Sequence, residues 1–238
     1  MPLTLSKKAQ AVKPSSTLAI TAKAKELRSK GIDVVGFGAG EPDFNTPDNI
    51  CEAAISAIKE GFTKYTPASG MNELKQAIAD KFERFNHIHY EPDQIVISNG
   101  GKHSLTNIFE AILNPGDEVI IPAPFWLSYP EIVKLSDGIP VFVQCKKEQN
   151  YKILPEQLRA ACTENTKAVI LNSPNNPTGM VYTKQELLAL AEVIIEKDIY
   201  VISDEIYENL IYEGDKPVSI ASLGEEIYRR TITCNGVA

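Results

Sequence analysis

Several features that would place a protein in a specialised class are absent from this chain of 238 residues. It has no apolar run long enough to cross a bilayer, so no membrane-spanning segment is predicted. Residues 1–13 are polar and lack the apolar stretch of a signal peptide. These absences make the cytoplasm the expected location.

Positive charge is also sparse, since 24 Lys and Arg residues stand against 31 Asp and Glu residues and the net charge is −7. Proteins that bind nucleic acids through the phosphates usually present a basic face. The sequence has no block of Lys and Arg that would form such a face, so no nucleic-acid partner is expected.

Cysteine and histidine are too few and too scattered to indicate a metal site. The four cysteines form no Cys-x-x-Cys pair, which is typical of free thiols in a reducing compartment. His87 and His89 form an isolated His-x-His pair in a polar stretch, which is more typical of a solvated loop than of metal ligands. No metal site is predicted.

What the chain does contain is a regular alternation of short apolar runs with helical stretches. This alternation is typical of βαβ units, so the sequence predicts an α/β fold whose mainly parallel sheet is sandwiched by helices. Helices are expected at residues 16–30, 47–60, 71–85, 102–113, 126–135, 155–162 and 184–197, the second of them capped by Thr46. Strands are expected at residues 33–37, 94–98, 118–121, 140–143, 168–171, 200–203 and 231–234.

Two domains are predicted from this pattern. Residues 1–46 are less regular and are expected to contribute to a smaller domain, whereas residues 47–238 form a larger α/β domain. The sequence stops at Ala238 directly after an apolar strand, and domains normally end in a surface linker. We therefore expect the larger domain to be truncated at its carboxyl-terminal side.

Ligands of open α/β sheets bind beyond the carboxyl ends of the strands, so the residues after each strand are candidate site residues. After the strand at 94–98, Gly101 and Lys102 open a helix whose N-terminal amides and cationic side chain favour an anion such as phosphate. A plain turn between strand and helix explains the glycines about as well. After the strand at 168–171, the prolines and asparagines of residues 172–179 favour a rigid binding loop over a simple turn.

Asp204 follows the strand at 200–203, where a buried carboxylate requires a cationic partner, unless it caps a helix or forms a structural ion pair. Glu205 is expected to point the other way, towards solvent or a helix. A phosphorylated pyridine ring satisfies all three strand ends, because Asp204 would pair with the protonated ring nitrogen. Trp126 either stacks on such a ring or packs in the core.

The chain resembles class I aminotransferases that depend on pyridoxal 5'-phosphate (PLP), and in particular the bacterial aspartate aminotransferase branch. The resemblance is carried by five runs in the order found in that family, namely residues 38–44 (GAGEPDF), 64–67 (KYTP), 100–102 (GGK), 172–179 (NSPNNPTG) and 203–207 (SDEIY). It covers the whole chain, and the last two runs together are highly specific. It implies PLP as cofactor and the fold of PLP transferases of fold type I.

The resemblance also implies roles for the residues that match the family pattern around the cofactor ring. Asp204 would pair with the pyridine nitrogen and act in catalysis together with Tyr207. Tyr207 and Asn176 would bind the hydroxyl oxygen of the ring. Trp126 would stack on the face of the ring.

Further implied contacts concern the phosphate and the substrate. Gly101 and Lys102 would give backbone donors to the phosphate. Tyr65 would reach the phosphate of the neighbouring subunit, which implies a homodimer with shared active sites. Gly40 would lie over the substrate, and Asn176 and Trp126 would also touch its carboxylate side.

The resemblance implies that the intact parent transfers an amino group from an amino acid, aspartate or glutamate, to a 2-oxo acid. The lysine that forms the Schiff base, and also acts as general base, is expected immediately after Ala238 and is absent from this sequence. Alternatives stay open, because a fold does not determine a function: a prephenate aminotransferase, a C–S lyase, or a non-catalytic, aminotransferase-like ligand-sensing module.

We expect the 238-residue chain alone to be inactive, because the catalytic lysine is not part of it. The measurement is glutamate formation by a folded preparation supplied with PLP, L-aspartate and 2-oxoglutarate. Turnover above the rate of the same mixture without protein would contradict this expectation.

Overall fold

The computed structural model describes residues 4–12, 16–38, 40, 44–214 and 217–237. It divides into two compact units, one formed by Lys13–Ala68 and the other by Met1–Val12 with Ser69–Ala238. The domain boundary expected after residue 46 stays a prediction about the intact protein.

The unit Lys13–Ala68 contains two helices, α2 (Ser16–Ser29) and α3 (Asp48–Lys59), which confirm the helices predicted there. Two details of the prediction are wrong. Residues 33–37 form no strand, and the side chains of Val35 and Phe37 are exposed instead of paired into a sheet. Pro47, not Thr46, holds the N-cap position of α3, and no side chain caps that helix.

The other unit is built on a five-stranded parallel sheet with the strand order β2-β1-β3-β4-β5. Its strands are β1 (Glu118–Ala123), β2 (Ile139–Gln144), β3 (Thr166–Asn172), β4 (Tyr200–Asp204) and β5 (Thr231–Cys234). All five were predicted, as was the parallel arrangement. Consecutive strands of a parallel sheet are joined by crossovers, and helices supply most of these connections.

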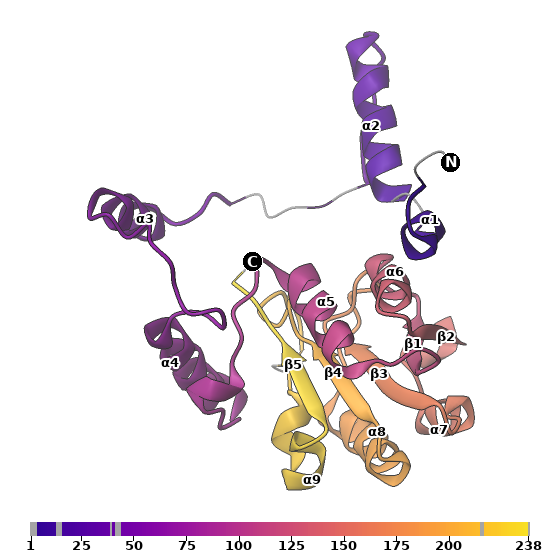
Figure 1. Cartoon of the computed structure of the whole chain (residues 1–238). Coiled ribbons are helices and arrows are strands. Elements are labelled where there is room, and N and C mark those ends of the chain that lie inside the picture. Colours follow the sequence, from indigo (N-terminus) through magenta and orange to yellow (C-terminus); the bar gives the residue numbers. More distant parts are fainter. Residues whose placement is uncertain (1–3, 13–15, 39, 41–43, 215–216, 238) are drawn as a thin grey trace. The chain divides into compact units, whose positions relative to one another are not determined.

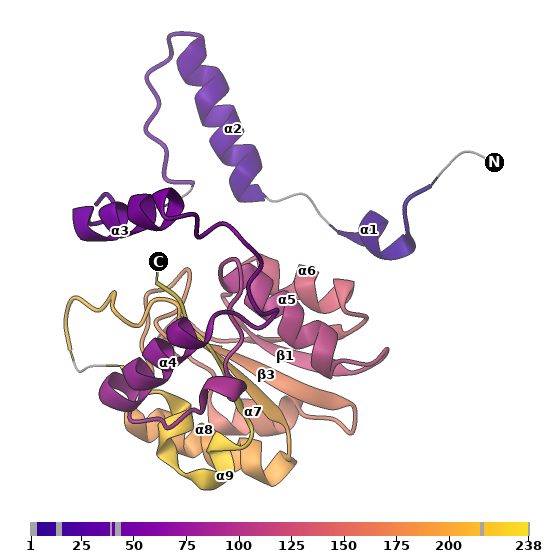
Figure 2. The same ribbon diagram turned by 60° about the vertical axis from the view of Figure 1, so that its left-hand side comes forward.

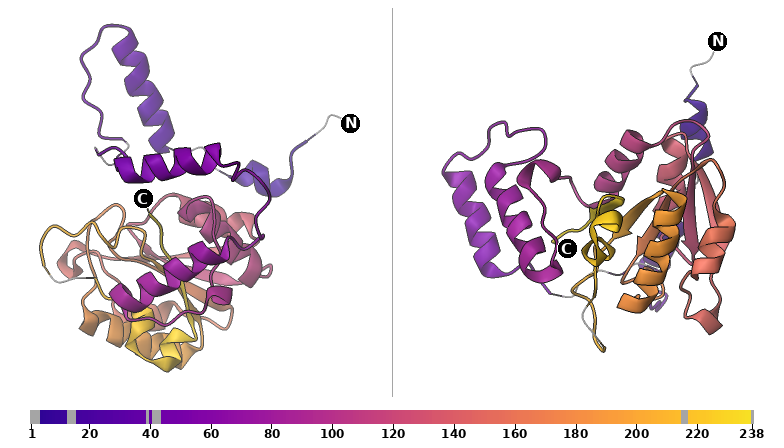
Figure 3. Two further views of the ribbon diagram at one scale, coloured as in Figure 1. Left: turned by 90° about the vertical axis from the view of Figure 1, so that its left-hand side faces the viewer. Right: turned by 90° about the horizontal axis from the view of Figure 1, so that it is seen from below.

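Two layers of helices cover the sheet (Figure 1). On one face lie α5 (Gly101–Ile112) and α6 (Ser128–Leu135), and on the other lie α7 (Pro155–Ala161), α8 (Lys184–Lys197) and α9 (Glu225–Tyr228). The short α1 (Lys7–Ala11) contacts the end of α6, because the ammonium group of Lys8 donates to the carbonyl oxygen of Leu135 (3.2 Å) and pairs with Asp137 just beyond the helix. The further views in Figures 2 and 3 show the same layers from other directions.

The central strands β1, β3 and β4 contribute side chains to two separate cores, because successive side chains point to opposite faces of a sheet. Ala168 and Ile170 of β3 pack with α5 and α6, whereas Val169 and Leu171 pack with α7 and α8. Strands buried on both faces read as continuous apolar runs, which is how the sequence identified them. No helix among the described residues is both long and apolar enough to cross a membrane.

The segment before the sheet folds as α4 (Asn72–Lys81), a π-helical turn η1 (Phe82–Asn86) and a 3-10 turn η2 (Pro92–Gln94). The strand predicted at 94–98 is wrong. The amide of Ile97 donates to the carbonyl oxygen of Ser69 (2.9 Å), but no strand of the described residues pairs with this stretch. An apolar run becomes a strand only where a neighbouring strand completes its hydrogen bonds.

The two-layer packing predicts which leucines of α8 stabilise the fold. Leu190 is 1% exposed, so Leu190→Ala should lower the free energy of unfolding by about 2–5 kcal/mol. Leu188 lies on the same helix but is 40% exposed, so Leu188→Ala is a matched control with an expected cost below about 1 kcal/mol. Urea unfolding followed by circular dichroism measures both, and equal losses would contradict the placement of α8.

Candidate active site

The carboxyl ends of β3, β4 and β5 lie side by side at one edge of the sheet. Asn172, the last residue of β3, is in register with Asp204 of β4, which is in register with Cys234 of β5. This edge carries the polar residues that the sequence singled out, so it is the candidate active site.

Asp204 is the most deeply buried charged group of this edge, at 4% exposure. Its carboxylate accepts a hydrogen bond from the hydroxyl of Tyr129 (2.6 Å) and another from the amide of Ile206 (3.2 Å). Burial raises the pKa of Asp204, and the two hydrogen bonds oppose that rise. Among the described residues no Lys or Arg forms an ion pair with Asp204, so this carboxylate is suited to a cationic ligand.

The loop at residues 172–179 is held against β4 by its first asparagine. The side-chain amide of Asn172 donates to the carbonyl oxygen of Asp204 (3.0 Å), and its oxygen accepts from the amide of Asn176 (2.7 Å). This pair of bonds directs Asn176 towards Tyr207, whose hydroxyl lies 3.5 Å from the Asn176 side-chain nitrogen. The structure thus brings Asn176 and Tyr207 together, as expected for two groups that bind one oxygen atom.

The start of α5 lies at this edge, where the carbonyl oxygen of Gly101 is 4.0 Å from the sulfur atom of Cys234, and it is suited to bind an anion. Gly100 has a positive φ of 85°, a conformation that favours glycine, and turns the chain into the helix. The amides of Gly101 and Lys102 lie in the first helical turn, where backbone N–H groups have no partner within the helix. A helix N-terminus of this kind attracts phosphate.

An aromatic ring lies next to this helix start. The ammonium group of Lys102 is 5.1 Å from the centroid of the half-buried Trp126 ring, and Trp126 in turn meets Tyr129 edge to face at 5.5 Å. One edge of the sheet therefore holds four groups: the carboxylate of Asp204, the N-terminus of α5, the pair of Asn176 and Tyr207, and the indole ring of Trp126. This set fits a flat ring that carries a protonated nitrogen, a hydroxyl oxygen and a phosphate, as PLP does.

Two of the predicted site residues belong to the other unit. Gly40 and Tyr65 are both exposed within the unit Lys13–Ala68, and their roles stay predictions. Residues 39 and 41–43 of the run at 38–44 lie outside the described residues, as does Ala238. Among the residues that the structure describes, no cluster of His, Cys, Asp or Glu is suited to hold a metal ion.

Sequence analysis missed Tyr129 and did not single out Asn172 within its loop. The sequence signal for Tyr129 is its spacing of three residues from Trp126, because residues three apart face the same side of a helical turn. Burial and the neighbouring Asp204 raise the pKa of Tyr129, so its hydroxyl keeps its proton and donates. For Asn172 the signal is its place at the end of a strand beside Asp204.

Removing the Tyr129 hydroxyl should raise the pKa of Asp204 further, because that hydrogen bond stabilises the ionised carboxylate. The measurement is a carbon-13 NMR titration of the Asp204 carboxyl in Tyr129→Phe, assigned with Asp204→Asn. Tyr200→Phe, at the other end of β4, is the control and should leave the pKa of Asp204 unchanged. An unchanged Asp204 titration in Tyr129→Phe would count against the hydrogen bond.

Known proteins match this chain closely. The family model described as aminotransferase class I and II matches residues 32–238. The aspartate aminotransferase of Bacillus sp. (strain YM-2) is 56% identical over 234 residues, which cover 98% of this chain and 60% of that protein. The aspartate/prephenate aminotransferase of Cereibacter sphaeroides is 52% identical over 228 residues, which cover 95% of this chain and 57% of that protein.

The fold matches a solved structure equally well. The aspartate aminotransferase from Thermus thermophilus with maleate superposes with a TM-score of 0.95 at 48% identity, covering 100% of this chain and 61% of that one. The chain therefore spans about 60% of the length of its curated relatives. This family and its fold are PLP-dependent. The chain, with its buried Asp204 at the edge of a parallel sheet, belongs to the class I and II aminotransferases.

Proposed function

We propose that the protein carrying this chain transfers an amino group from aspartate or glutamate to a 2-oxo acid, with PLP as cofactor. The observation that carries the proposal is the buried carboxylate of Asp204, which has no ion-pair partner among the described residues. Relatives named aspartate aminotransferase support the choice of substrate. A second candidate, transamination of prephenate, is supported by relatives named aspartate/prephenate aminotransferase.

In this proposal the residues of the sheet edge hold and polarise the cofactor ring. PLP, when bound, withdraws electrons from the substrate α-carbon. Asp204 keeps the proton on the pyridine nitrogen, because a buried carboxylate stabilises a neighbouring positive charge. Tyr207 and Asn176 donate to the ring hydroxyl oxygen, and Trp126 stacks on the ring and excludes water from that face.

The other contacts follow the same geometry. Gly101 and Lys102 give their backbone amides to the phosphate at the start of α5. Asn176 and Trp126 also border the carboxylate side of the substrate, and Gly40 lies over the substrate. The lysine expected after Ala238 would hold the cofactor and move the proton at the α-carbon.

We further propose a homodimer in which Tyr65 binds the phosphate of the partner subunit's site. The side chain of Tyr65 is fully exposed within its own unit. Helix α3 supports the dimer, because it buries none of its residues while Ile50, Ile55 and Ile58 are each more than half exposed. An apolar helix face of this kind is typical of an interface. The cytoplasmic location stays a prediction.

The test compares this chain with the protein extended past Ala238 by its own coding sequence, called here the extended protein. Visible absorbance is recorded with PLP and then with excess L-aspartate. We expect the extended protein to bind PLP and to show a spectral change on addition of aspartate. Absence of PLP binding by the extended protein would refute the assignment of the sheet edge as a cofactor site. Profiles with prephenate and with 2-oxoglutarate decide between the two substrate classes.

Asp204→Asn in the extended protein should lower kcat roughly a hundredfold or more, since an amide does not hold the ring proton as a carboxylate does. Glu226→Gln is the control, because the exposed Glu226 of α9 pairs with Arg230, which lies just before the start of β5 and away from its carboxyl end. Similar rates for Asp204→Asn and the unmodified extended protein would show that Asp204 does not contact the cofactor.

A further inference from the structure

Residues 204–208 comprise the last residue of β4 and the four that follow it. Some of their side chains belong to the candidate active site and others do not. The amide of Glu208 donates to the carbonyl oxygen of Glu205 (3.0 Å), which closes a turn over Ile206 and Tyr207. Asp204 and Tyr207 belong to the candidate active site. Glu205 and Glu208 have no part in it, yet they are only 5% and 8% exposed. Two buried acids that the proposed chemistry does not use require an explanation.

Glu205 is fixed by hydroxyl groups. One oxygen of its carboxyl group accepts from Ser203 of β4 (2.8 Å) and from Ser219 (2.6 Å), which immediately precedes the 3-10 turn η4 (Ile220–Leu223). Its amide donates to the carbonyl oxygen of Cys234 at the end of β5 (2.8 Å). Burial raises the pKa of Glu205 to about 7. Of the two directions expected from the sequence, towards solvent or towards a helix, the first is wrong, because Glu205 is only 5% exposed.

Glu208 is fixed by a cation and an amide. Its two carboxylate oxygens accept from the ammonium group of Lys81, at the end of α4, and from the side-chain nitrogen of Asn86 in η1 (2.8 Å). A buried carboxylate paired in this way is strongly sensitive to loss of its partner, because a single unpaired charge is then left in the interior.

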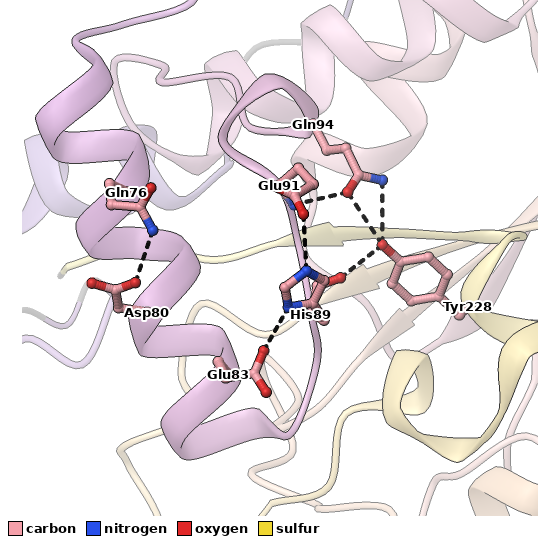
Figure 4. A network of polar contacts seen from close by, with 7 residues as sticks. All are labelled: Gln76, Asp80, Glu83, His89, Glu91, Gln94 and Tyr228. Carbon is pink, nitrogen blue, oxygen red and sulfur yellow. Dashed lines mark hydrogen bonds and ion pairs between the residues drawn. The ribbon is translucent and has the colours of Figure 1, made fainter.

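The segment that supplies Lys81 and Asn86 is itself attached to the sheet. Tyr90 shares a hydrogen bond with Thr233 of β5 (2.9 Å) and stacks on Tyr228 of α9 with centroids 5.5 Å apart. Figure 4 shows the hydroxyl of Tyr228 between His89 and Gln94: it donates to the carbonyl oxygen of His89 (2.9 Å) and accepts from the Gln94 side chain (3.2 Å). Lys81 and Asn86 therefore belong to a segment that is attached to the sheet, and they hold Glu208 in place.

We propose that Glu205 and Glu208 are positioning residues. They hold the turn at residues 204–208 from the side that faces away from the candidate active site, and this turn presents Tyr207 to the cofactor ring. This inference deepens the proposed function and rests on it. With both ends of the turn anchored, Tyr207 has little freedom to leave the position in which its hydroxyl meets Asn176. A binding group that moves freely makes a weaker contact. Glu205 and Glu208 therefore act on the ring hydroxyl indirectly, by restricting the movement of Tyr207.

A role in stability alone explains this arrangement poorly. Buried ion pairs are often no better for stability than well-packed apolar side chains of similar volume, whereas they do fix one geometry. The pair of Lys81 and Glu208 joins α4 to the turn that follows β4, two segments 127 residues apart in the sequence. The proposal therefore predicts effects on position that a loss of stability would not produce.

The first test needs no cofactor and uses the 238-residue chain. Lys81→Met removes the cation, and hydrogen exchange of the Glu208 amide should then become at least about tenfold faster, because its bond to Glu205 opens more often. Lys81→Arg is the conservative variant and should keep the slow exchange. Amides within α8 serve as an internal reference and should not change. Should Lys81→Met fail to fold, Lys81→Met with Glu208→Gln carries the test without an unpaired buried charge.

The second test uses the extended protein and the pH dependence of the PLP absorbance. Tyr207 stabilises the ionised form of the ring hydroxyl, so a mobile Tyr207 should move the absorbance transition to higher pH. Lys81→Met, or the double variant, should show this shift and bind PLP roughly tenfold more weakly. Lys81→Arg should keep the absorbance transition and the PLP affinity of the unmodified protein. Glu225→Gln, in the exposed ion pair with Arg229, is the matched control and should behave like the unmodified protein.

The outcomes separate this inference from the proposed function. Slow exchange of the Glu208 amide in every folded variant would refute the anchoring itself. Faster exchange with an unchanged absorbance transition and PLP affinity would show that the anchors stabilise the fold without positioning Tyr207, which also overturns the proposal. If the unmodified extended protein binds no PLP, the proposed function fails and, with it, the role of the anchors towards a cofactor, whereas the exchange result still decides whether they hold the turn.

Discussion

Parallel pairing of β3, β4 and β5 in one register is the constraint on which the candidate site depends. It places Asn172, Asp204 and Cys234 side by side at the carboxyl edge, although they are separated by about thirty residues each along the chain. Because β3 and β4 are buried on both faces by helices, a register slip of one residue would move their apolar side chains from one core to the other. The packing of the sheet therefore also fixes the relative positions of the polar groups at its end.

The sequence predicted this part of the molecule well because each signal was local. Apolar runs of four to seven residues alternate with amphipathic helices from residue 101 onwards, and the observed strands and helices follow that pattern closely. Asp204 was singled out because a polar residue at the end of a buried strand is unusual, whereas the roles of Asn176 and Tyr207 came from the resemblance to class I aminotransferases. All three roles stay predictions. The helix start at Gly101 was found from its glycines and Lys102, although residues 94–98 before it form no strand.

The misses have one cause, which is dependence on a partner distant in the sequence. Residues 33–37 and 94–98 have the apolar character of strands, but no described strand pairs with them, and a strand is defined by its neighbour. Tyr129 reads as an ordinary core residue until Asp204 is seen 2.6 Å from its hydroxyl. Likewise, the burial of Glu205 follows from Ser219, fourteen residues later in the sequence. No local pattern reveals these distant partners, although the spacing of Tyr129 from Trp126 indicates that the two residues face the same side.

The turn after β4 shows how one short segment serves two purposes. Side chains that alternate in direction allow Asp204 to face the candidate site while Ser203 and Glu205 face the opposite core. In the proposed function Asp204 stays buried and charged beside a cation. Such a group needs rigid surroundings, since any opening admits water and weakens the attraction between the two charges. In our proposal the buried acids Glu205 and Glu208, which are bonded to different elements, supply that rigidity from outside the site. The segment is thus polar throughout, and the direction of each side chain decides whether it binds a ligand or holds the backbone.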